Sequence, residues 1–248
     1  MDLENEDKRM ALAESVFAVA ARTMEQHGLQ TPQLADACER LGIGVRCGPP
    51  TIRPLAQSMF CAGRARPVKL NGNFEALLEI LENSDPGNVL VIDGAGEPAR
   101  CCMGDLMAAE IKNAGLSGIM IWGAHRDTLD LVALGLPIFS IGAFPFARST
   151  PPSSPGDGPA RVGEAIVTSD DFVACDCDGS VFVRGEHVGA AIEAALQIQE
   201  GELARARHMR DGHGLREQLA YADYRARRKV DPSYTFKVHT KSLADRRK

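Results

Sequence analysis

Short apolar runs alternate with amphipathic segments through the middle of the chain. The runs at 89–92 and 118–122 carry no charged residue, which is typical of strands buried on both faces of a sheet. Between them, the spacing of apolar residues predicts a helix from Asp105 to Asn113, followed by Gly115 as its stop signal. Because parallel strands joined by a helix share one direction, we expect both strands to end at the same edge of a sheet.

The same alternation extends to both sides of this pair of strands. Helical spacing predicts helices at about 7–27, 31–41, 71–83 and 128–134, and short strands within 59–70 and at 137–140. The helix at 31–41 has the clearest ends, because Thr31 can cap it, Pro32 suits its first position and Gly42 follows it.

The pattern changes after a loop at 148–160 that is rich in Pro, Ser and Gly. Short strands are predicted at 162–167, 171–175 and 180–183, with Asp178-Gly179 as a hairpin turn, and helices at 186–209 and 215–229. The sequence therefore predicts an α/β fold in one domain over 1–248. That domain has a helical N-terminal segment at about 7–42 and a helical C-terminal extension at about 186–240.

Groups that can bind an anion lie at the start of the predicted helix at 105–113. Gly104 would let the backbone approach a ligand closely. The N–H groups of Leu106 and Met107 lie in the first turn, where the helix dipole favours a negative group such as a carboxylate. Open α/β sheets bind ligands at the carboxyl ends of their strands, which is where this turn is expected.

Charged side chains follow the second buried strand at the same expected edge. Arg126 is a planar cation that could hold a carboxylate or stabilise an enolate, and Asp105 and Asp127 are the oxygen ligands that Mg²⁺ prefers. Each pattern also has a simpler interpretation. Gly-Asp before a helix is commonly an N-cap, and Arg-Asp after a strand is commonly a surface ion pair.

Several motifs in this region resemble the signature of the RraA-like family. They are Asp93-Gly94, Met103-Gly104-Asp105-Leu106, Gly115-x-x-Gly118, Gly123-Ala124-x-Arg126-Asp127 and Leu134-Gly135-Leu136-Pro137-Ile138-Phe139, with further similarity at 31–42 and 174–181. The family is named after a regulator of ribonuclease activity, and it includes 4-hydroxy-4-methyl-2-oxoglutarate aldolases and oxaloacetate decarboxylases. The resemblance implies a swivelling β/β/α layered fold, assembled as a homotrimer or a hexamer of two trimers.

The resemblance also implies an activity: a class II lyase, dependent on Mg²⁺ or Mn²⁺, that cleaves a C–C bond of a small 2-oxo acid and releases pyruvate. By resemblance, the backbone at Leu106 and Met107 binds the substrate together with Arg126. Gly104 is a further substrate-binding candidate, because its backbone lets a ligand approach closely. Asp127 matches the metal ligand.

Other residues in or near this site are candidates for catalysis or for substrate specificity. Arg126 and Asp105 are the catalytic candidates, Arg126 for the enolate charge and Asp105 for positioning the water that takes a proton from the substrate hydroxyl. Family aldolases use an acidic residue from a neighbouring subunit. Glu200 is the nearest candidate for it, as a second residue at the metal beside Asp127, and Glu202 is the alternative. His125 and Trp122 differ from the usual residues, which leaves the natural substrate open. A packing role is expected for His125.

Composition places the chain among ordinary globular proteins, with 44% hydrophobic and 25% charged residues. The seven cysteines, including Cys101-Cys102 and the pair Cys175 and Cys177, form neither a disulfide framework nor a zinc-finger pattern. Structural thiols in a reducing cytoplasm are expected. Cys101 and Cys102 are expected to lie in the loop before the anion site, where they could be sensitive to oxidation. No apolar run is long enough to suggest a membrane span.

Charge is uneven along the chain. Residues 1–201 hold 15 Lys and Arg against 27 Asp and Glu, whereas residues 202–248 hold 13 against 6. The basic end shows no RNA-binding motif, so a solvated face or a subunit contact is favoured over nucleic-acid binding. The alternative to an enzyme is a non-catalytic regulator that binds a ribonuclease or a helicase. The sequence leaves aldol cleavage and decarboxylation equally open.

Overall fold

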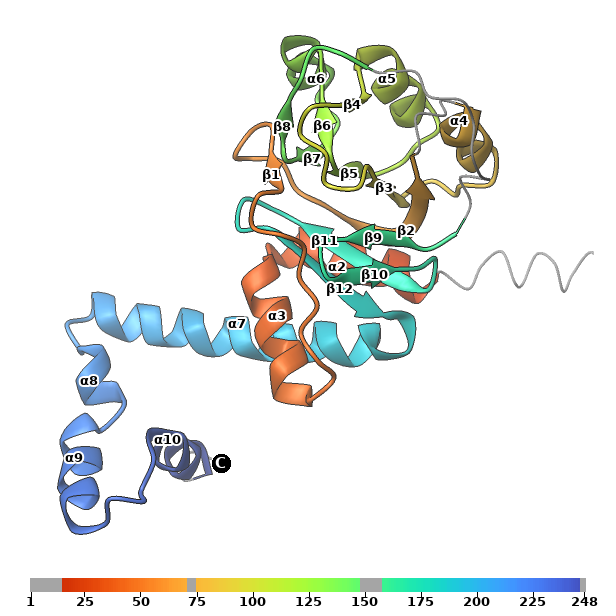
Figure 1. The fold of residues 1–248 in the computed structure, drawn as a ribbon. Helices are drawn as coiled ribbons and strands as arrows, with labels where there is room; N and C mark the ends of the chain where they lie inside the picture. Colours follow the sequence, from red (N-terminus) through yellow and green to blue (C-terminus); the bar gives the residue numbers. More distant parts are fainter. Residues whose placement is uncertain (1–14, 71–74, 148–157, 246–248) are drawn as a thin grey trace, which may run out of the picture. The chain divides into compact units, whose positions relative to one another are not determined.

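The structure, a computed structural model, describes residues 15–70, 75–147 and 158–245. Contacts within the chain define two compact units, one ending at Leu196 and the other formed by Gln197–Lys248 (Figure 1). The first is a mixed α/β unit and the second is helical. One domain over 1–248 with a helical extension stays a prediction.

A seven-stranded sheet organises the first unit. Its order is β1 (Arg53–Pro54), β7 (Ile138–Ser140), β5 (Gly118–Trp122), β3 (Val89–Asp93), β2 (Cys61–Lys69), β11 (Asp171–Cys175) and β12 (Ser180–Arg184). Strands β2, β3, β5 and β7 are parallel, and β1, β11 and β12 run antiparallel to their neighbours. Asp93 pairs with Trp122 at the ends of β3 and β5. This register confirms that the two buried runs end at one edge.

Strand β2 corrects the expectation of short irregular strands within 59–70. It is one continuous strand of nine residues between β3 and β11. Pro67 lacks the backbone N–H that a central strand normally uses, yet it pairs with Val91 of β3. Two arginines interrupt the apolar pattern that would indicate a buried strand. Both form hydrogen bonds: Arg64 Nε donates to the Ser169 carbonyl at 2.6 Å, and Arg66 Nε donates to the Ser84 hydroxyl at 3.3 Å.

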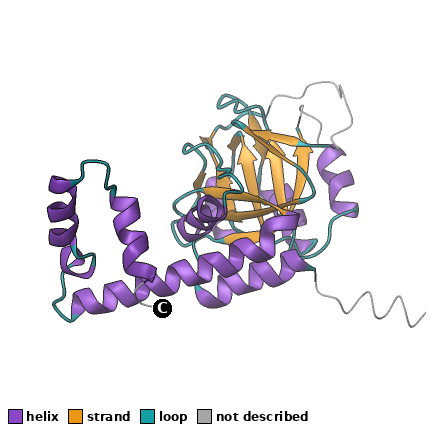
Figure 2. Ribbon diagram, turned by 90° about the horizontal axis from the view of Figure 1, so that it is seen from below, coloured by secondary structure: helices purple, strands orange, loops and turns teal. Residues whose placement is uncertain are grey.

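The sheet carries a core on each face, because successive side chains of a strand point to opposite sides. Leu90 and Ile92 of β3 pack with the helical layer of α4 (Glu75–Glu82), α5 (Asp105–Asn113) and α6 (Thr128–Leu134). Val89 and Val91 pack with the hairpin of β9 (Ala160–Val162) and β10 (Ala165–Val167). Figure 2 shows the strands between helices. The mixed α/β fold with a curled sheet and flanking helices is therefore confirmed.

A small parallel sheet beside the main one was not expected from the sequence. It consists of β4 (Cys101–Met103), β6 (Ala124–His125) and β8 (Gly142–Ala143). Strand β4 replaces the loop predicted before Asp105. The backbone N–H of Arg126 donates to the Met103 carbonyl at 3.0 Å, which ties the end of β6 to the end of β4.

The predicted helices at the N-terminal side are found with changed ends. Helix α2 (Val16–His27) is capped by Ser15, and residues 7–14 of that predicted helix lie outside the described residues. Residues 71–74 of the helix predicted at 71–83 also lie outside them, and α4 is its described part. Helix α3 (Thr31–Leu41) has Gln30 as its N-cap, so Thr31 is not the cap. The Thr31 hydroxyl instead donates to Asp176 Oδ1 at 2.7 Å, a partner 145 residues away that local sequence does not reveal.

The elements predicted between 162 and 209 are partly confirmed. The predicted strand at 162–167 is the β9–β10 hairpin, which turns at Gly163 with φ +59°. The hairpin turn at Asp178-Gly179 is confirmed by the pairing of Cys175 with Ser180. A short 3₁₀ turn at Gly185–His187 precedes α7 (Val188–Arg210), which continues through Gly201.

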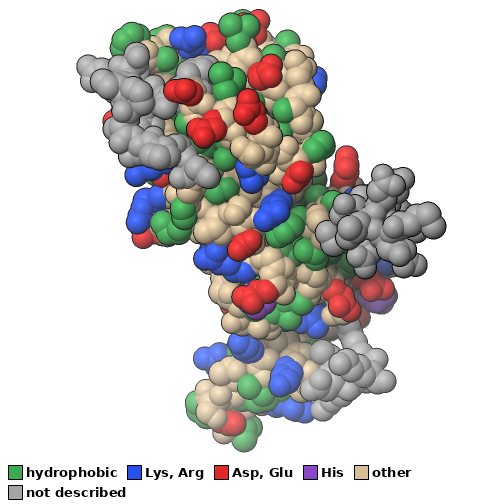
Figure 3. Space-filling view, turned by 90° about the vertical axis from the view of Figure 1, so that its right-hand side faces the viewer, with side chains coloured by type: hydrophobic (Ala, Val, Ile, Leu, Met, Phe, Trp, Pro, Cys, Tyr) green, Lys and Arg blue, Asp and Glu red, His purple; other side chains and the backbone are tan. Residues whose placement is uncertain are grey.

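Three short helices complete the second unit. They are α8 (Leu215–Gln218), α9 (Tyr221–Val230) and α10 (Phe236–Asp245), and Ala220 with φ +45° breaks the single helix predicted at 215–229. Tyr224 and His239 are buried between these helices. The unit holds 13 Lys and Arg against 7 Asp and Glu, and blue basic side chains are visible on its surface in Figure 3. None of the described helices has the length and apolar character needed to cross a bilayer.

Candidate functional site

Two strand-to-helix connections at the edge of the small sheet bring the predicted residues together. Strand β4 leads through Gly104 into α5, and β6 leads through Arg126 and Asp127 into α6. A Cβ atom on Gly104 would lie 2.3 Å from Asp127 Oδ2 and 3.1 Å from Arg126 Nε. The lack of space for a side chain therefore requires glycine at position 104. Its backbone conformation does not, since a φ of −127° would suit any residue.

The Asp127 carboxylate faces the start of α5 rather than its own helix. Asp127 is the N-cap of α6, but its side chain makes no capping bond there. Its Oδ2 accepts from the Asp105 N–H at 3.4 Å and from Arg126 Nε at 3.3 Å. Asp127 has φ +61°, a left-handed conformation that costs a non-glycine residue about 1 kcal/mol. Both contacts use Oδ2. Within the described part of the chain, Oδ1 has no hydrogen-bond donor, so it can bind another ligand.

The start of α5 is open on one side and anchored on the other. Leu106 is 82% exposed, whereas Met107 is buried in the helical core. N–H groups in the first turn of a helix have no partner within the helix, so those of Leu106 and Met107 can donate hydrogen bonds to an anionic ligand. The Arg126 and Asp127 side chains are partly exposed, at 45% and 33%. A small charged molecule could therefore reach all of these groups.

Glu200 and Glu202 are the two candidates for an acidic residue from a neighbouring subunit. Both lie on α7 within the second unit, whereas Gly104, Arg126 and Asp127 lie in the first. A contribution from either glutamate to a site shared between subunits stays a prediction.

His125 is buried at the end of β6, next to Arg126 in the sequence. Its Nδ1 lies 2.7 Å from Ser140 Oγ and its Nε2 lies 2.9 Å from Thr128 Oγ1. Burial lowers the pKa of His125 below its ordinary value. A neutral, hydrogen-bonded ring supports the expected packing role. The sequence did not reveal Ser140, because it lies on another strand 15 residues away.

The cysteines near the site are not exposed nucleophiles. Cys101 and Cys102 lie on β4 and are 7% and 3% exposed, which corrects their placement in an oxidation-sensitive loop. Burial raises the pKa of both thiols, that of Cys102 to about 11. A thiol that stays protonated near neutral pH is a poor nucleophile.

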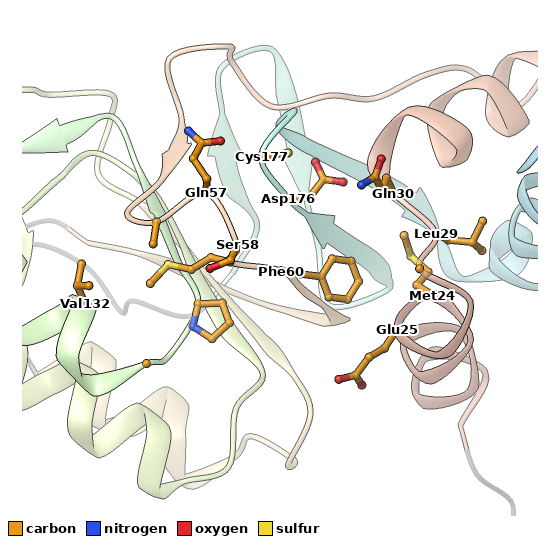
Figure 4. A pocket seen from close by; sticks show the side chains of 15 residues that line it. Met24, Glu25, Leu29, Gln30, Gln57, Ser58, Phe60, Val132, Asp176 and Cys177 are labelled. Carbon is orange, nitrogen blue, oxygen red and sulfur yellow. The ribbon is translucent and has the colours of Figure 1, made fainter. Parts of the chain in front are cut away.

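A separate pocket of about 770 Å³ lies at the opposite edge of the sheet (Figure 4). Its lining includes Glu25 of α2, Phe60 before β2 and Pro137 before β7. Asp176 also lines it, and with Cys177 and Asp178 it forms a group of possible metal ligands within 4.8 Å of one another. Asp176 already accepts from Thr31 and from the Asp178 N–H, so a structural role explains this carboxylate.

Known proteins resemble this chain in sequence. The family model of RraA-like proteins, described as Aldolase/RraA, matches residues 31–182. A protein of Halalkalibacterium halodurans named "Putative 4-hydroxy-4-methyl-2-oxoglutarate aldolase" is 29% identical over 162 residues, which cover 65% of this chain and 77% of that protein. A Burkholderia mallei protein of the same name is 31% identical over 153 residues, 60% of this chain and 92% of its own.

Two solved structures share the fold. An uncharacterized protein from Pseudomonas syringae has a TM-score of 0.69 at 21% identity, over 82% of this chain and 98% of that one. RraAS2 of Streptomyces coelicolor, described as an unusual member of the RNase ES inhibitor RraA protein family, has a TM-score of 0.65 at 26% identity. That match covers 75% of this chain and 96% of RraAS2.

Proposed function

Because the chain belongs to the RraA-like family, we propose that it is a divalent-metal-dependent lyase that releases pyruvate from a small 2-oxo acid. The observation that carries the proposal is the close approach of Gly104 to Asp127 and Arg126 at the start of α5. A backbone anion site, a cation and a carboxylate converge there. The aldolase names of the relatives agree with this chemistry.

The Asp127 carboxylate fits a hard cation. It is partly exposed, and both of its hydrogen bonds within the described residues use Oδ2. One carboxylate completed by waters is a usual way for a protein to bind Mg²⁺, and Mn²⁺ accepts the same oxygen ligands. A bound cation would supply Lewis acidity to the carbonyl of the substrate.

The residues around the substrate divide the remaining work. The N–H groups of Leu106 and Met107 hold the substrate carboxylate, and Arg126 stabilises the negative charge that develops on the enolate oxygen. In aldol cleavage, the 4-hydroxyl loses its proton to a water positioned by Asp105. The C3–C4 bond then breaks with its electron pair moving into the pyruvate enolate, while the former hydroxyl oxygen forms the C=O bond of the second product. In decarboxylation of oxaloacetate, CO₂ leaves and the same enolate forms. Protonation of the enolate carbon gives pyruvate in both reactions.

Binding of oxalate tests this assignment without turnover. Oxalate resembles the planar pyruvate enolate in shape and carries two carboxylates. We expect calorimetry to detect oxalate binding to the full chain in the presence of Mg²⁺, and at least about tenfold weaker binding in excess chelator. Equal binding under both conditions would contradict the metal-dependent site.

Replacing Gly104 with alanine should damage the site while the fold survives. The added methyl group would meet Asp127 Oδ2 at 2.3 Å and would displace the carboxylate. We expect kcat/KM for pyruvate release to fall at least about tenfold. Gly189→Ala is the matched control, because a Cβ there meets no atom within 4 Å. Equal activity of Gly104→Ala and Gly189→Ala, with equal melting temperatures, would contradict this geometry.

The assembly provides a separate prediction. The proposed acidic residue from a neighbouring subunit, Glu200 or Glu202, requires a closed homo-oligomer. Light scattering on the full chain should give the mass of a trimer or a hexamer at micromolar concentration. A monomer at that concentration would exclude a site shared between subunits.

A non-catalytic regulator is the second candidate function. The structural likeness to RraAS2, described as belonging to an RNase ES inhibitor family, favours it, as does the net positive second unit. Capture of a ribonuclease or helicase by a protein that releases no pyruvate would support this candidate over the lyase.

A further inference from the structure

His125 lies directly before the two charged residues of the site and is only 4% exposed. Both ring nitrogens are engaged, Nδ1 with Ser140 at 2.7 Å and Nε2 with Thr128 at 2.9 Å. Two bonds from opposite sides of one ring fix its rotation. The ring therefore joins the end of β6 to β7 on one side and to the start of α6 on the other.

The bond to Thr128 spans the Arg126–Asp127 pair. His125 and Thr128 are three residues apart, and the residues between them include Asp127 in its left-handed conformation. On either side, the Arg126 N–H donates to the Met103 carbonyl at 3.0 Å, and the Leu131 N–H donates to the Asp127 carbonyl at 3.0 Å. The His125–Thr128 bond closes the turn between these two backbone anchors.

This turn determines where the Asp127 side chain lies. Asp127 could serve its own helix as a capping residue, but the carboxylate instead contacts the Asp105 N–H and Arg126. The left-handed backbone at Asp127 directs it there, and relaxation of that backbone would carry the carboxylate away from Gly104.

Ser140 has a different part in the arrangement. Its hydroxyl also accepts from the Gly142 N–H at 3.3 Å, so it anchors the imidazole to the segment that leads from β7 into β8. The anchor orients the ring, and the contact with Thr128 transmits that orientation to the turn. The two bonds can be separated experimentally because they use different nitrogens.

We propose that His125 is a positioning residue that holds Asp127 in its ligand-binding orientation through the hydroxyl of Thr128. The inference rests on the proposed metal-dependent function and adds a residue to it that does not itself touch the substrate. Groups that orient a metal ligand commonly change metal affinity by about 10- to 100-fold when removed.

Two substitutions separate the contacts of His125. A glutamine amide reaches as far as Nε2 and can bond to Thr128, whereas an asparagine amide reaches only as far as Nδ1 and can bond to Ser140. The measured quantity is the dissociation constant for Mn²⁺ alone, determined on the 248-residue chain by electron paramagnetic resonance. His125→Gln should stay within about threefold of the wild type, and His125→Asn should bind Mn²⁺ at least about tenfold more weakly.

A control removes a buried hydrogen bond of the same unit outside the site. Thr31→Val deletes the contact with Asp176 at 2.7 Å and should lower the melting temperature without changing the affinity for Mn²⁺. If His125→Asn and His125→Gln bind Mn²⁺ equally well or equally poorly, the role of Thr128 is wrong. A wild-type protein that binds no Mn²⁺ would instead overturn the proposed metal site, and this role with it.

Discussion

Asp127→Ala is expected to lower magnesium-dependent pyruvate release by at least about 10³-fold, because it removes the proposed protein ligand for the cation. The carboxylate also neutralises Arg126 and contacts the start of α5, so its loss disturbs the anion site as well. The measurement is kcat/KM at saturating Mg²⁺, together with the Mg²⁺ concentration needed for half-maximal rate.

Two further variants separate the chemistry from the fold. Asp127→Asn keeps the size of the side chain and tolerates the left-handed backbone, so it should fold like the wild type and still lose activity. Asp130→Ala removes an exposed carboxylate from the first turn of the same helix and should keep full activity. Activity of Asp127→Asn within about threefold of the wild type would show that the carboxylate charge is not needed.

Arg126→Lys is expected to lower kcat/KM by at least about 10²-fold, which corresponds to about 2.7 kcal/mol of transition-state stabilisation. Lysine keeps the positive charge but loses the planar pair of donors that can hold a carboxylate from one side. The guanidinium is partly exposed and its Nε contacts Asp127, so the substitution changes the site rather than the core.

The matched control for Arg126→Lys is Arg40→Lys, on the exposed face of α3. It makes the same chemical change outside the site and should leave kcat/KM unchanged. Steady-state pyruvate production from oxaloacetate would measure both variants. If Arg126→Lys and Arg40→Lys are equally active, Arg126 has no catalytic role. A binding partner of the regulator type should be captured equally well by both.

The sequence predicted correctly those strands and helices whose residues show a clear local pattern. The uncharged runs became β3 and β5, Gly115 follows α5, and Gly42 ends α3 in the left-handed conformation. Parallel pairing then followed from the crossover rule, and it brought the chain after β5 close to the start of α5. The convergence of Gly104, Arg126 and Asp127 was thus accessible from the sequence.

Features that depend on distant contacts were not accessible in this way. Strand β2 contains Pro67 and two arginines, whose partners lie on other segments. Strand β4 has three residues and is recognisable only beside β6. The contacts of His125 with Ser140 and of Thr31 with Asp176 join positions that no local pattern connects.

The central claim is that the edge formed by Gly104, Arg126 and Asp127 releases pyruvate with the help of a divalent cation. The most direct measurement is a coupled assay for pyruvate, run on oxaloacetate and on 4-hydroxy-4-methyl-2-oxoglutarate with Mg²⁺ and then with excess chelator. We predict pyruvate from at least one substrate with Mg²⁺ and a loss of at least about 10²-fold with chelator. Release that is undiminished by chelator, or no release from either substrate, would contradict the claim.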